Sequence, residues 1–447
     1  MLSGDFRYEK KRSAPDASSK ALAHYAMGII YDNESKLTEA LQEYKAALAL
    51  EPKVSYLHSR LGVNYLLAKD INKAIEEFNT AKSLDPNDTK PRFLLALAYT
   101  ALNKYDLARK EYEDVVRINP NDIAALGSLA DLLVVQEKMA DAVGIYEKLV
   151  EKEKGSSLLY FNLGVIYSRL GKISPAIRML NKAVELDPGY LEAYIGLGVL
   201  CEMNKDNPGA IANFEKALKI DPLNIQVYYS LGNLYYRAKR IGDASHQYEL
   251  LVKLNPKDLE AYIQWSGVYI RDKRPKEAIA VLNRALSEGI KDTSLYIALG
   301  YAYSTDSRGA DALKYYRMAL DTSPDSALAH FHLGAYYDKI RNNPPAVSEF
   351  REAIRLDPKF SDAYNYLGYM YAEEGTNLDE AVVLIKKAIE LEPDNAAYID
   401  SLGWAYFQKG KFGEALVELE KAVKLEPDDT EIKEHLKRAK EKLKKRP

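Results

Sequence analysis

A 34-residue period runs through almost the whole chain of 447 residues and constrains its fold more than any other feature. Alanines recur at this step without a gap from Ala40 to Ala346. Gly28, Tyr31 and Pro52 begin three further series that follow the same period, with some positions filled by other residues. Self-similarity at a period between 20 and 50 residues indicates a repeat array in which each unit packs only on its neighbours.

Each unit carries the pattern L-G-x2-Y, then A-x3-F/Y, then A, and most units close with P. This pattern at a 34-residue period resembles the tetratricopeptide repeat (TPR) family. Twelve tandem units run from about residue 21 to residue 429. The resemblance implies an all-α fold: a right-handed α-solenoid, or TPR superhelix, of twelve helix-turn-helix repeats plus a C-terminal capping helix.

The repeated residues have physical reasons for their places. With Gly28 as position 8 of the first unit, helix A covers about positions 2–14 and helix B about positions 15–30. Position 8 is glycine in nine units and position 20 is alanine in all twelve, so the two helices are expected to approach closely. A large side chain at position 24 is expected to fill the space between neighbouring units, and proline at position 32 ends helix B.

The ends of the array differ from its repeats. Residues 1–20 are predicted to form a flexible N-terminal segment. Residues 430–447 do not match the repeat, but Ile432 and Leu436 lie on an apolar stripe among charged residues. This pattern predicts a capping helix and tail that cover the last unit and present a polar outer face.

Two units lack the closing proline, and Lys154 and Ile290 stand in its place. Gly155 and Gly289 lie beside them, and a glycine after a helix can end it through a left-handed cap. One hypothesis is that these junctions are joints between sub-blocks 21–156, 157–292 and 293–429. The alternative is neutral drift in the turn.

Composition argues against several functions. The net charge is −3, so nucleic acid is not an expected partner. No run of about 18 apolar residues is present, which predicts no direct membrane span. The only cysteine, Cys201, falls in the tyrosine slot of its unit, and three of the six histidines occupy an aromatic packing position. We therefore expect no catalytic, cofactor-binding or metal-binding residues, and no enzyme.

Function is expected on the exposed stripe of helix A. In TPR arrays the stripe at positions 2, 5, 9 and 12 lines the concave surface where partners dock, and aromatic and arginine side chains are favoured as interface hot spots. The alternative is that these aromatic residues only pack along their own superhelix. The predicted partner-binding groove comprises Tyr25, Phe93, Phe161, Tyr229, Asn233, Tyr236, Arg237, Tyr301, Phe331, Asn365, Tyr369, Trp404 and Phe407.

These features predict a protein–protein interaction scaffold that holds a peptide or helix of a partner in the groove. The alternative is an accessory subunit of a bacterial envelope or export assembly, or of a glycosyltransferase complex. The N-terminus contains no hydrophobic core segment, which favours a cytoplasmic protein. A periplasmic or envelope-associated location stays open if a signal sequence has been removed.

Overall fold

The computed structural model describes residues 16–444, which form 25 α-helices and no strand. The chain divides into two compact units, residues 1–221 and 222–447, and each holds six helix-turn-helix repeats. The predicted all-α array of twelve repeats with a final helix is therefore confirmed. The unit boundary coincides with neither predicted joint, and the three-block division stays a prediction.

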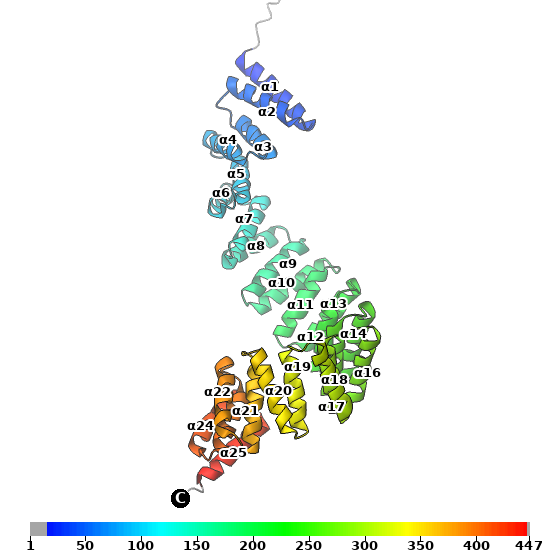
Figure 1. The fold of residues 1–447 in the computed structure, drawn as a ribbon. Helices are drawn as coiled ribbons and strands as arrows, with labels where there is room; N and C mark the ends of the chain where they lie inside the picture. Colours follow the sequence, from blue (N-terminus) through cyan, green and yellow to red (C-terminus); the bar gives the residue numbers. More distant parts are fainter. Residues whose placement is uncertain (1–15, 445–447) are drawn as a thin grey trace, which may run out of the picture. The chain divides into compact units, whose positions relative to one another are not determined.

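The first unit contains six pairs of helices joined by short turns (Figure 1). Its helices are α1 (Ala17–Asn33), α2 (Leu37–Leu50), α3 (Ser55–Leu67), α4 (Ile71–Leu84), α5 (Thr89–Ala101), α6 (Tyr105–Ile118), α7 (Ile123–Val135), α8 (Met139–Lys152), α9 (Ser157–Arg169), α10 (Ile173–Leu186), α11 (Leu191–Met203) and α12 (Asn207–Ile220). Residues 17–20 are helical, which corrects the expectation that they belong to a flexible segment. Residues 1–15 of that segment lie outside the described residues.

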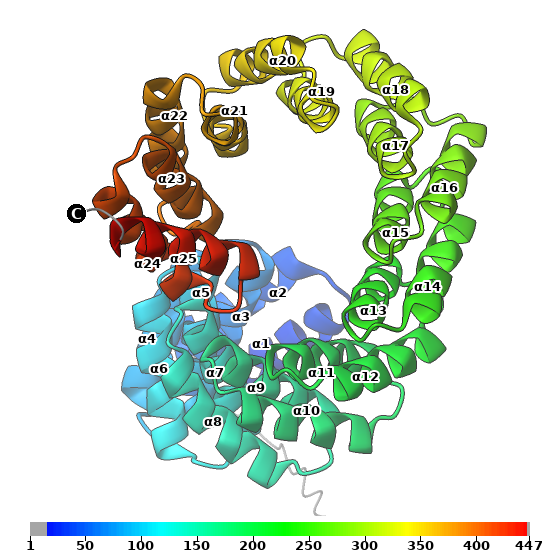
Figure 2. The same cartoon turned by 90° about the horizontal axis from the view of Figure 1, so that it is seen from below.

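The second unit contains six more pairs and one unpaired helix. Its helices are α13 (Ile225–Arg237), α14 (Ile241–Leu254), α15 (Leu259–Arg271), α16 (Pro275–Ser287), α17 (Thr293–Thr305), α18 (Gly309–Thr322), α19 (Ala327–Lys339), α20 (Asn343–Leu356), α21 (Ser361–Glu374), α22 (Leu378–Leu391), α23 (Ala396–Gln408), α24 (Phe412–Leu425) and α25 (Thr430–Lys444). Within this unit α13, α15, α17, α19 and α21 lie on the inner side of an arc, and α14, α16, α18, α20 and α22 lie outside them (Figure 2).

Close packing inside each repeat explains the conserved spacing of small residues along the chain. A Cβ atom added to Gly62 would lie 2.6 Å from the ring of Phe78, and one added to Gly198 would lie 2.6 Å from the ring of Phe214. The alanine at position 20 is fully buried in every repeat. The position-24 side chain thus packs on the glycine of its own repeat, and not only in the space between repeats as the sequence led us to expect.

The same pair of backbone bonds closes the turn between helices A and B throughout the array, although the eleventh repeat adds a second left-handed residue, Asn377. Lys69 has a left-handed backbone with φ of 62°, its N–H donates to Leu66 O, and the N–H of Asp70 donates to Tyr65 O at 2.9 Å. These two bonds form a Schellman motif, which satisfies carbonyl groups at the end of helix A. Equivalent bonds close the turn in the other repeats.

The two junctions without proline end their helices differently. Gly289 has a φ of 81° and forms the left-handed cap that the sequence predicts. Gly155 is not left-handed, and the N–H of Glu153 instead bonds to Leu149 O at 2.8 Å. Ser156 then accepts the N–H of Leu159 and begins α9. The expected glycine cap at Gly155 is therefore wrong, because Glu153, with a φ of −117° and a ψ of 64°, ends α8 and a serine N-cap begins α9.

Candidate functional site

All the predicted groove residues lie on the first helix of a repeat, but their surroundings differ. Tyr301 is 51% exposed, and Asn233 and Arg237 are also exposed. Tyr25, Phe93, Phe161, Tyr229, Tyr236 and Tyr369 are half-buried. Phe331, Asn365, Trp404 and Phe407 are buried. The stripe is thus an accessible surface only in parts.

The C-terminal end of the stripe is covered by the chain itself. Trp404 is 2% exposed and Phe407 is 8% exposed. The ring of Trp404 stacks on His435 of α25 with a centroid distance of 4.3 Å, and the guanidinium of Arg438 lies 4.5 Å from the same ring. The prediction that Trp404 and Phe407 face a partner is therefore wrong, because the cap helix occupies that place.

Phe331 also belongs to an internal cluster. Its ring centroid lies 4.9 Å from that of Phe360 and 5.0 Å from that of Tyr366. Aromatic pairs at these separations stabilise packing. For Phe331 the alternative therefore holds, in which aromatic side chains of the stripe pack along their own array.

Some polar members of the stripe hydrogen-bond within the repeats. Tyr248 donates its hydroxyl proton to Asn233 Oδ1 at 3.0 Å, and Tyr229 donates to Asp258 Oδ1 at 2.8 Å. Burial and the Asp258 carboxylate raise the pKa of Tyr229. These two stripe residues are therefore held by neighbouring helices, which fixes their side-chain positions.

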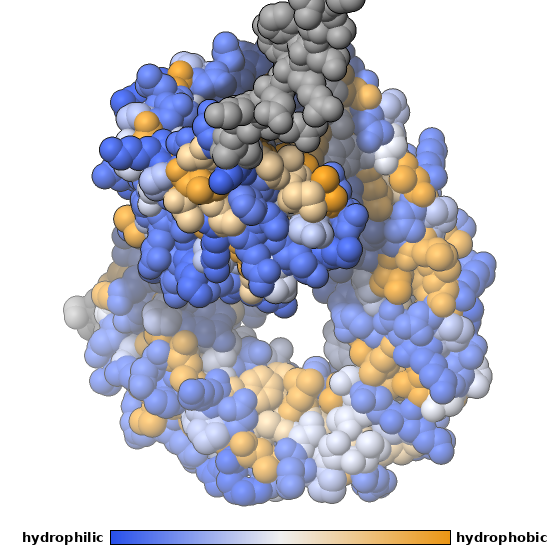
Figure 3. All heavy atoms as spheres, turned by 90° about the horizontal axis from the view of Figure 1, so that it is seen from above, coloured by the Kyte–Doolittle hydropathy of each residue, from blue (hydrophilic) through white to orange (hydrophobic). Residues whose placement is uncertain are grey.

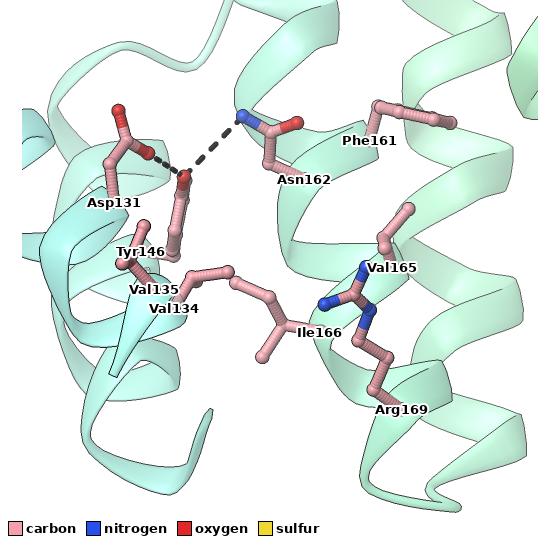
Figure 4. Close-up of a pocket in the computed structure, with 9 residues that line it drawn as sticks. All are labelled: Asp131, Val134, Val135, Tyr146, Phe161, Asn162, Val165, Ile166 and Arg169. Atoms are coloured by element: carbon pink, nitrogen blue, oxygen red, sulfur yellow. Dashed lines mark hydrogen bonds between the residues drawn. The ribbon is translucent and has the colours of Figure 1, made fainter. Parts of the chain in front are cut away.

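One cavity lies on the stripe of the first unit, between α7 and α9, and has a volume of about 330 Å³. We call it the α7/α9 cavity. Figure 4 shows the side chains that line it, most of which come from these two helices. Apolar groups dominate the lining, and four residues add polar groups. The lining residues are Asp131, Val134, Val135, Tyr146, Phe161, Asn162, Val165, Ile166 and Arg169.

A short hydrogen-bond chain fixes one wall of the α7/α9 cavity. Tyr146 of α8 donates to Asp131 Oδ1 at 2.6 Å, and Asn162 Nδ2 donates to the Tyr146 hydroxyl at 3.4 Å (Figure 4). Burial and the neighbouring Asp131 carboxylate raise the pKa of Tyr146. Asp131 and Arg169 are exposed, so one anionic and one cationic group border an apolar depression.

Of the lining residues, only Phe161 belongs to the predicted groove. Asp131 stands at position 9 of the fourth repeat, and the same pairing of a position-24 tyrosine with a polar side chain of helix A recurs in Tyr44–Asp32 and Tyr248–Asn233. An aspartate or asparagine on helix A accompanies three of the five tyrosines at position 24, and this pairing is the signal that sequence reasoning missed. Val134 and Val135 gave no sequence signal, because apolar residues are common throughout the array.

Family models for tetratricopeptide repeats match most of the chain. Those described as tetratricopeptide repeat match residues 25–89, 65–133, 157–190, 229–293, 349–382 and 371–440, and one described as TPR repeat matches residues 200–239. The chain belongs to the tetratricopeptide repeat family.

Two solved structures are similar to this chain at low sequence identity. The structure of Naa15/Naa10 bound to HypK-THB is 16% identical with a TM-score of 0.50, and the match covers 94% of this chain and 66% of that one. This TPR chain thus spans slightly less than two thirds of that relative. Yeast Tom70 is 18% identical with a TM-score of 0.43 over 95% of each chain. A comparison with curated protein sequences gave no match.

The titratable groups of this TPR protein are held in structural contacts. His58 Nδ1 lies 2.6 Å from Glu77 Oε2, and its Nε2 lies 3.1 Å from the carbonyl of Pro52. His330 repeats both contacts with Glu349 and Pro324. These histidines therefore join helix A to helix B and to the preceding turn, which goes beyond the aromatic packing that the sequence predicts.

The described residues offer no built centre for a metal ion. Among residues 16–444, no group of three or more His, Cys, Asp or Glu side chains has the geometry to hold one. Cys201 is buried, and burial raises the pKa of its thiol, which disfavours the reactive thiolate. No helix in the same range combines the length and apolar character needed to cross a bilayer.

Proposed function

We propose that this TPR protein is a non-catalytic interaction scaffold that binds a peptide segment of a partner protein, with an apolar side chain of that segment in the α7/α9 cavity. The cavity carries the proposal. Its volume of about 330 Å³ and its largely apolar lining suit one large aliphatic or aromatic side chain. Asp131 and Arg169 at its border offer an acceptor and a donor for the peptide backbone.

Two further features support a scaffold. On the face shown in Figure 3 apolar residues form small groups within a largely hydrophilic surface, which suits recognition through separate anchor sites. The Naa15/Naa10 structure with the same fold is bound to HypK-THB. By analogy, a partner protein is the ligand class we propose here, in the cytoplasm or, for the accessory-subunit alternative, at the envelope.

The test compares two matched substitutions, Val165→Arg in the cavity and Val383→Arg on α22. Val383 is exposed and does not line the cavity, so it controls for the added charge. Peptides selected on the wild-type chain from a random phage library would be titrated against both variants by fluorescence anisotropy. We expect Val165→Arg to weaken binding at least about tenfold because its side chain fills the cavity, and Val383→Arg to leave it unchanged.

Selected peptides that bind Val165→Arg as tightly as wild type would contradict the proposal. Affinity capture from lysate and envelope fractions, with wild type and Val165→Arg in parallel, then identifies the partner. A catalytic subunit that is lost with Val165→Arg would favour the accessory role over a free-standing scaffold.

A further inference from the structure

A second cavity, in the C-terminal part of the chain, has an acidic lining. It has a volume of about 320 Å³ and lies among residues of α21, α23 and α25 and the turn that precedes α25. Four of its ten lining residues are acidic, namely Asp400, Glu426, Asp429 and Glu431, and none is lysine or arginine. We call this cavity the acidic pocket.

Two buried side chains that line the acidic pocket carry acceptor oxygens without a hydrogen-bond partner. Asp400 is 6% exposed, and its Oδ2 lies 2.8 Å from His435 Nδ1, while its Oδ1 has no hydrogen-bond partner. Asn365 is 8% exposed, and its Oδ1 is also without a partner. Buried acceptors are rarely left unpaired in native proteins, because their desolvation is then uncompensated. Two such oxygens in one cavity indicate that a donor belongs there.

The surrounding groups do not supply that donor. Asp429 Oδ1 already accepts the N–H groups of Glu431 and Ile432 as the N-cap of α25. The hydroxyl of Tyr369 donates to Glu431 Oε1 at 3.3 Å. Burial, together with the negative charges of Glu373, Glu431 and Asp400, raises the pKa of Tyr369, so several carboxylates act on the pocket at once.

We propose that the acidic pocket binds the positively charged side chain, lysine or arginine, of a partner peptide. An ammonium or guanidinium group offers only donors and one positive charge, which complements a site that offers acceptors and negative charge. The rings of Tyr366 and Tyr369 line the same cavity and provide faces for cation–π contact. The inference deepens the proposed function, since it rests on the chain binding a peptide, and it adds a second anchor site of opposite character to the α7/α9 cavity.

The chain contains a reporter for occupation of this pocket. Trp404 stacks on His435, which contacts Asp400, and only one other tryptophan, Trp265, is present. In a Trp265→Phe background, the fluorescence of Trp404 therefore reports a charge that arrives at Asp400. The probe is the tripeptide N-acetyl-Gly-Arg-Gly amide, and the same tripeptide with citrulline is its uncharged isostere.

We expect the arginine tripeptide to change Trp404 fluorescence saturably and the citrulline tripeptide to bind at least about tenfold more weakly. Asp400→Asn is expected to weaken arginine binding at least about tenfold, because it removes the charge and keeps the shape. Glu434→Gln removes a charge from an exposed site of α25 outside the pocket and is expected to change binding less than about twofold. Equal binding of both tripeptides, or of wild type and Asp400→Asn, would overturn the proposal.

A second variant and a second ligand complete the experiment. If Asp400→Asn does not fold, the double variant Glu426→Gln/Glu431→Gln changes only exposed positions, and unaltered binding to it would overturn the proposal. Spermidine that binds more tightly than the tripeptide would assign the pocket to free amines and overturn the peptide assignment. Val165→Arg is expected to leave tripeptide binding intact, so failure of the α7/α9 cavity and failure of the acidic pocket are distinguishable.

Discussion

At the scale of single residues, the close packing of helices A and B depends on the lack of a Cβ atom at the position-8 glycine. The glycine at position 8 leaves room for a ring or branched side chain of helix B, and an added Cβ would meet that side chain at 3.0 Å or less in all nine repeats with this glycine. Glycine weakens an isolated helix by about 1 kcal/mol relative to alanine, so the close helix contact must offset that weakness.

Gly198→Ala is predicted to destabilise the chain by roughly 1–2 kcal/mol. The new methyl group would overlap Phe214, and the overpacking exceeds the gain in helix propensity. Gly127 is the matched control, because it also lies in helix A of its repeat but has open space around its Cβ position. Gly127→Ala is predicted to stabilise the chain by up to about 1 kcal/mol. Urea unfolding followed by circular dichroism measures both, and a shift of the same sign in the two variants would refute this account.

Residue-level prediction from the sequence was accurate where a local rule operates. The repeat pattern predicts that the small residues at positions 8 and 20 form the contact between helices A and B, because that contact lies within 34 residues of sequence. Trp404 and Phe407 were misassigned because their cover is α25, and the stripe pattern of α23 does not show which face another helix occupies. That Asp400 and Asn365 carry buried oxygens without a hydrogen-bond partner is likewise visible only in the folded structure, because it depends on which helices surround them.

At the scale of elements, the turn between helices A and B combines a left-handed residue with a basic residue in most repeats. Arg240 lies 4.4 Å from the ring centroid of Tyr235, Arg308 lies 4.6 Å from that of Tyr303, and Lys172 lies 5.8 Å from that of Tyr167. Each pair joins position 16 to position 11, the two ends of the Schellman bonds. In these repeats the cation–π contact favours a tyrosine at position 11.

Lys205→Gly is predicted to stabilise the chain by about 0.5–1 kcal/mol. Lys205 has a φ of 60°, a region that glycine enters without the steric penalty of a Cβ atom. Lys219→Gly makes the same replacement inside α12 and is predicted to destabilise by about 1 kcal/mol. Thermal unfolding followed by circular dichroism compares the two variants. A lower midpoint for Lys205→Gly would contradict the prediction, because the Lys205 side chain would then stabilise the fold by more than its left-handed backbone destabilises it.

These turns were hard to predict in detail. The left-handed site holds lysine, serine, asparagine, glutamate or arginine in most repeats and glycine in few, so the residue type alone does not reveal the conformation. The backbone geometry follows from closing the Schellman bonds between two helices at close distance. The glycine cap expected at Gly155 is wrong for the same reason, since no left-handed glycine is required where a C-cap residue with negative φ, Glu153, ends the helix.

At the scale of the whole molecule, the repeat predicts the number and kind of elements and little about how they group. Twelve repeats and the final helix follow from one pattern, but the division into units of six repeats does not, because the junction at Pro222 carries the same closing proline as most other junctions. Tyrosine is abundant along the whole chain. It occurs 34 times, and many of these side chains are buried within repeats.

The protein is predicted to unfold cooperatively as the pH rises from about 10 to about 12. Burial raises the pKa of Tyr248 to about 12, and burial also raises the pKa of Tyr316 and Tyr146. In the unfolded chain these phenols ionise near pH 10. A group whose pKa is raised by folding contributes stability that is present below its unfolded pKa and is lost as the pH rises towards its folded value. Tyrosinate absorbance at 295 nm and helix ellipticity are therefore expected to change together.

Tyr316→Phe tests the cause of this alkaline unfolding. The ring of Tyr316 is buried, so phenylalanine keeps the packing and removes the ionisable group. The variant is predicted to have about wild-type stability at pH 7 and an alkaline midpoint raised by about 0.1–0.3 pH unit. Tyr301→Phe replaces a ring that is 51% exposed and is expected to leave the midpoint in place. If the tyrosinate signal developed fully near pH 10 while the helices persisted, the buried phenols would not be coupled to folding, and the stability of the array would have to rest on its apolar contacts alone.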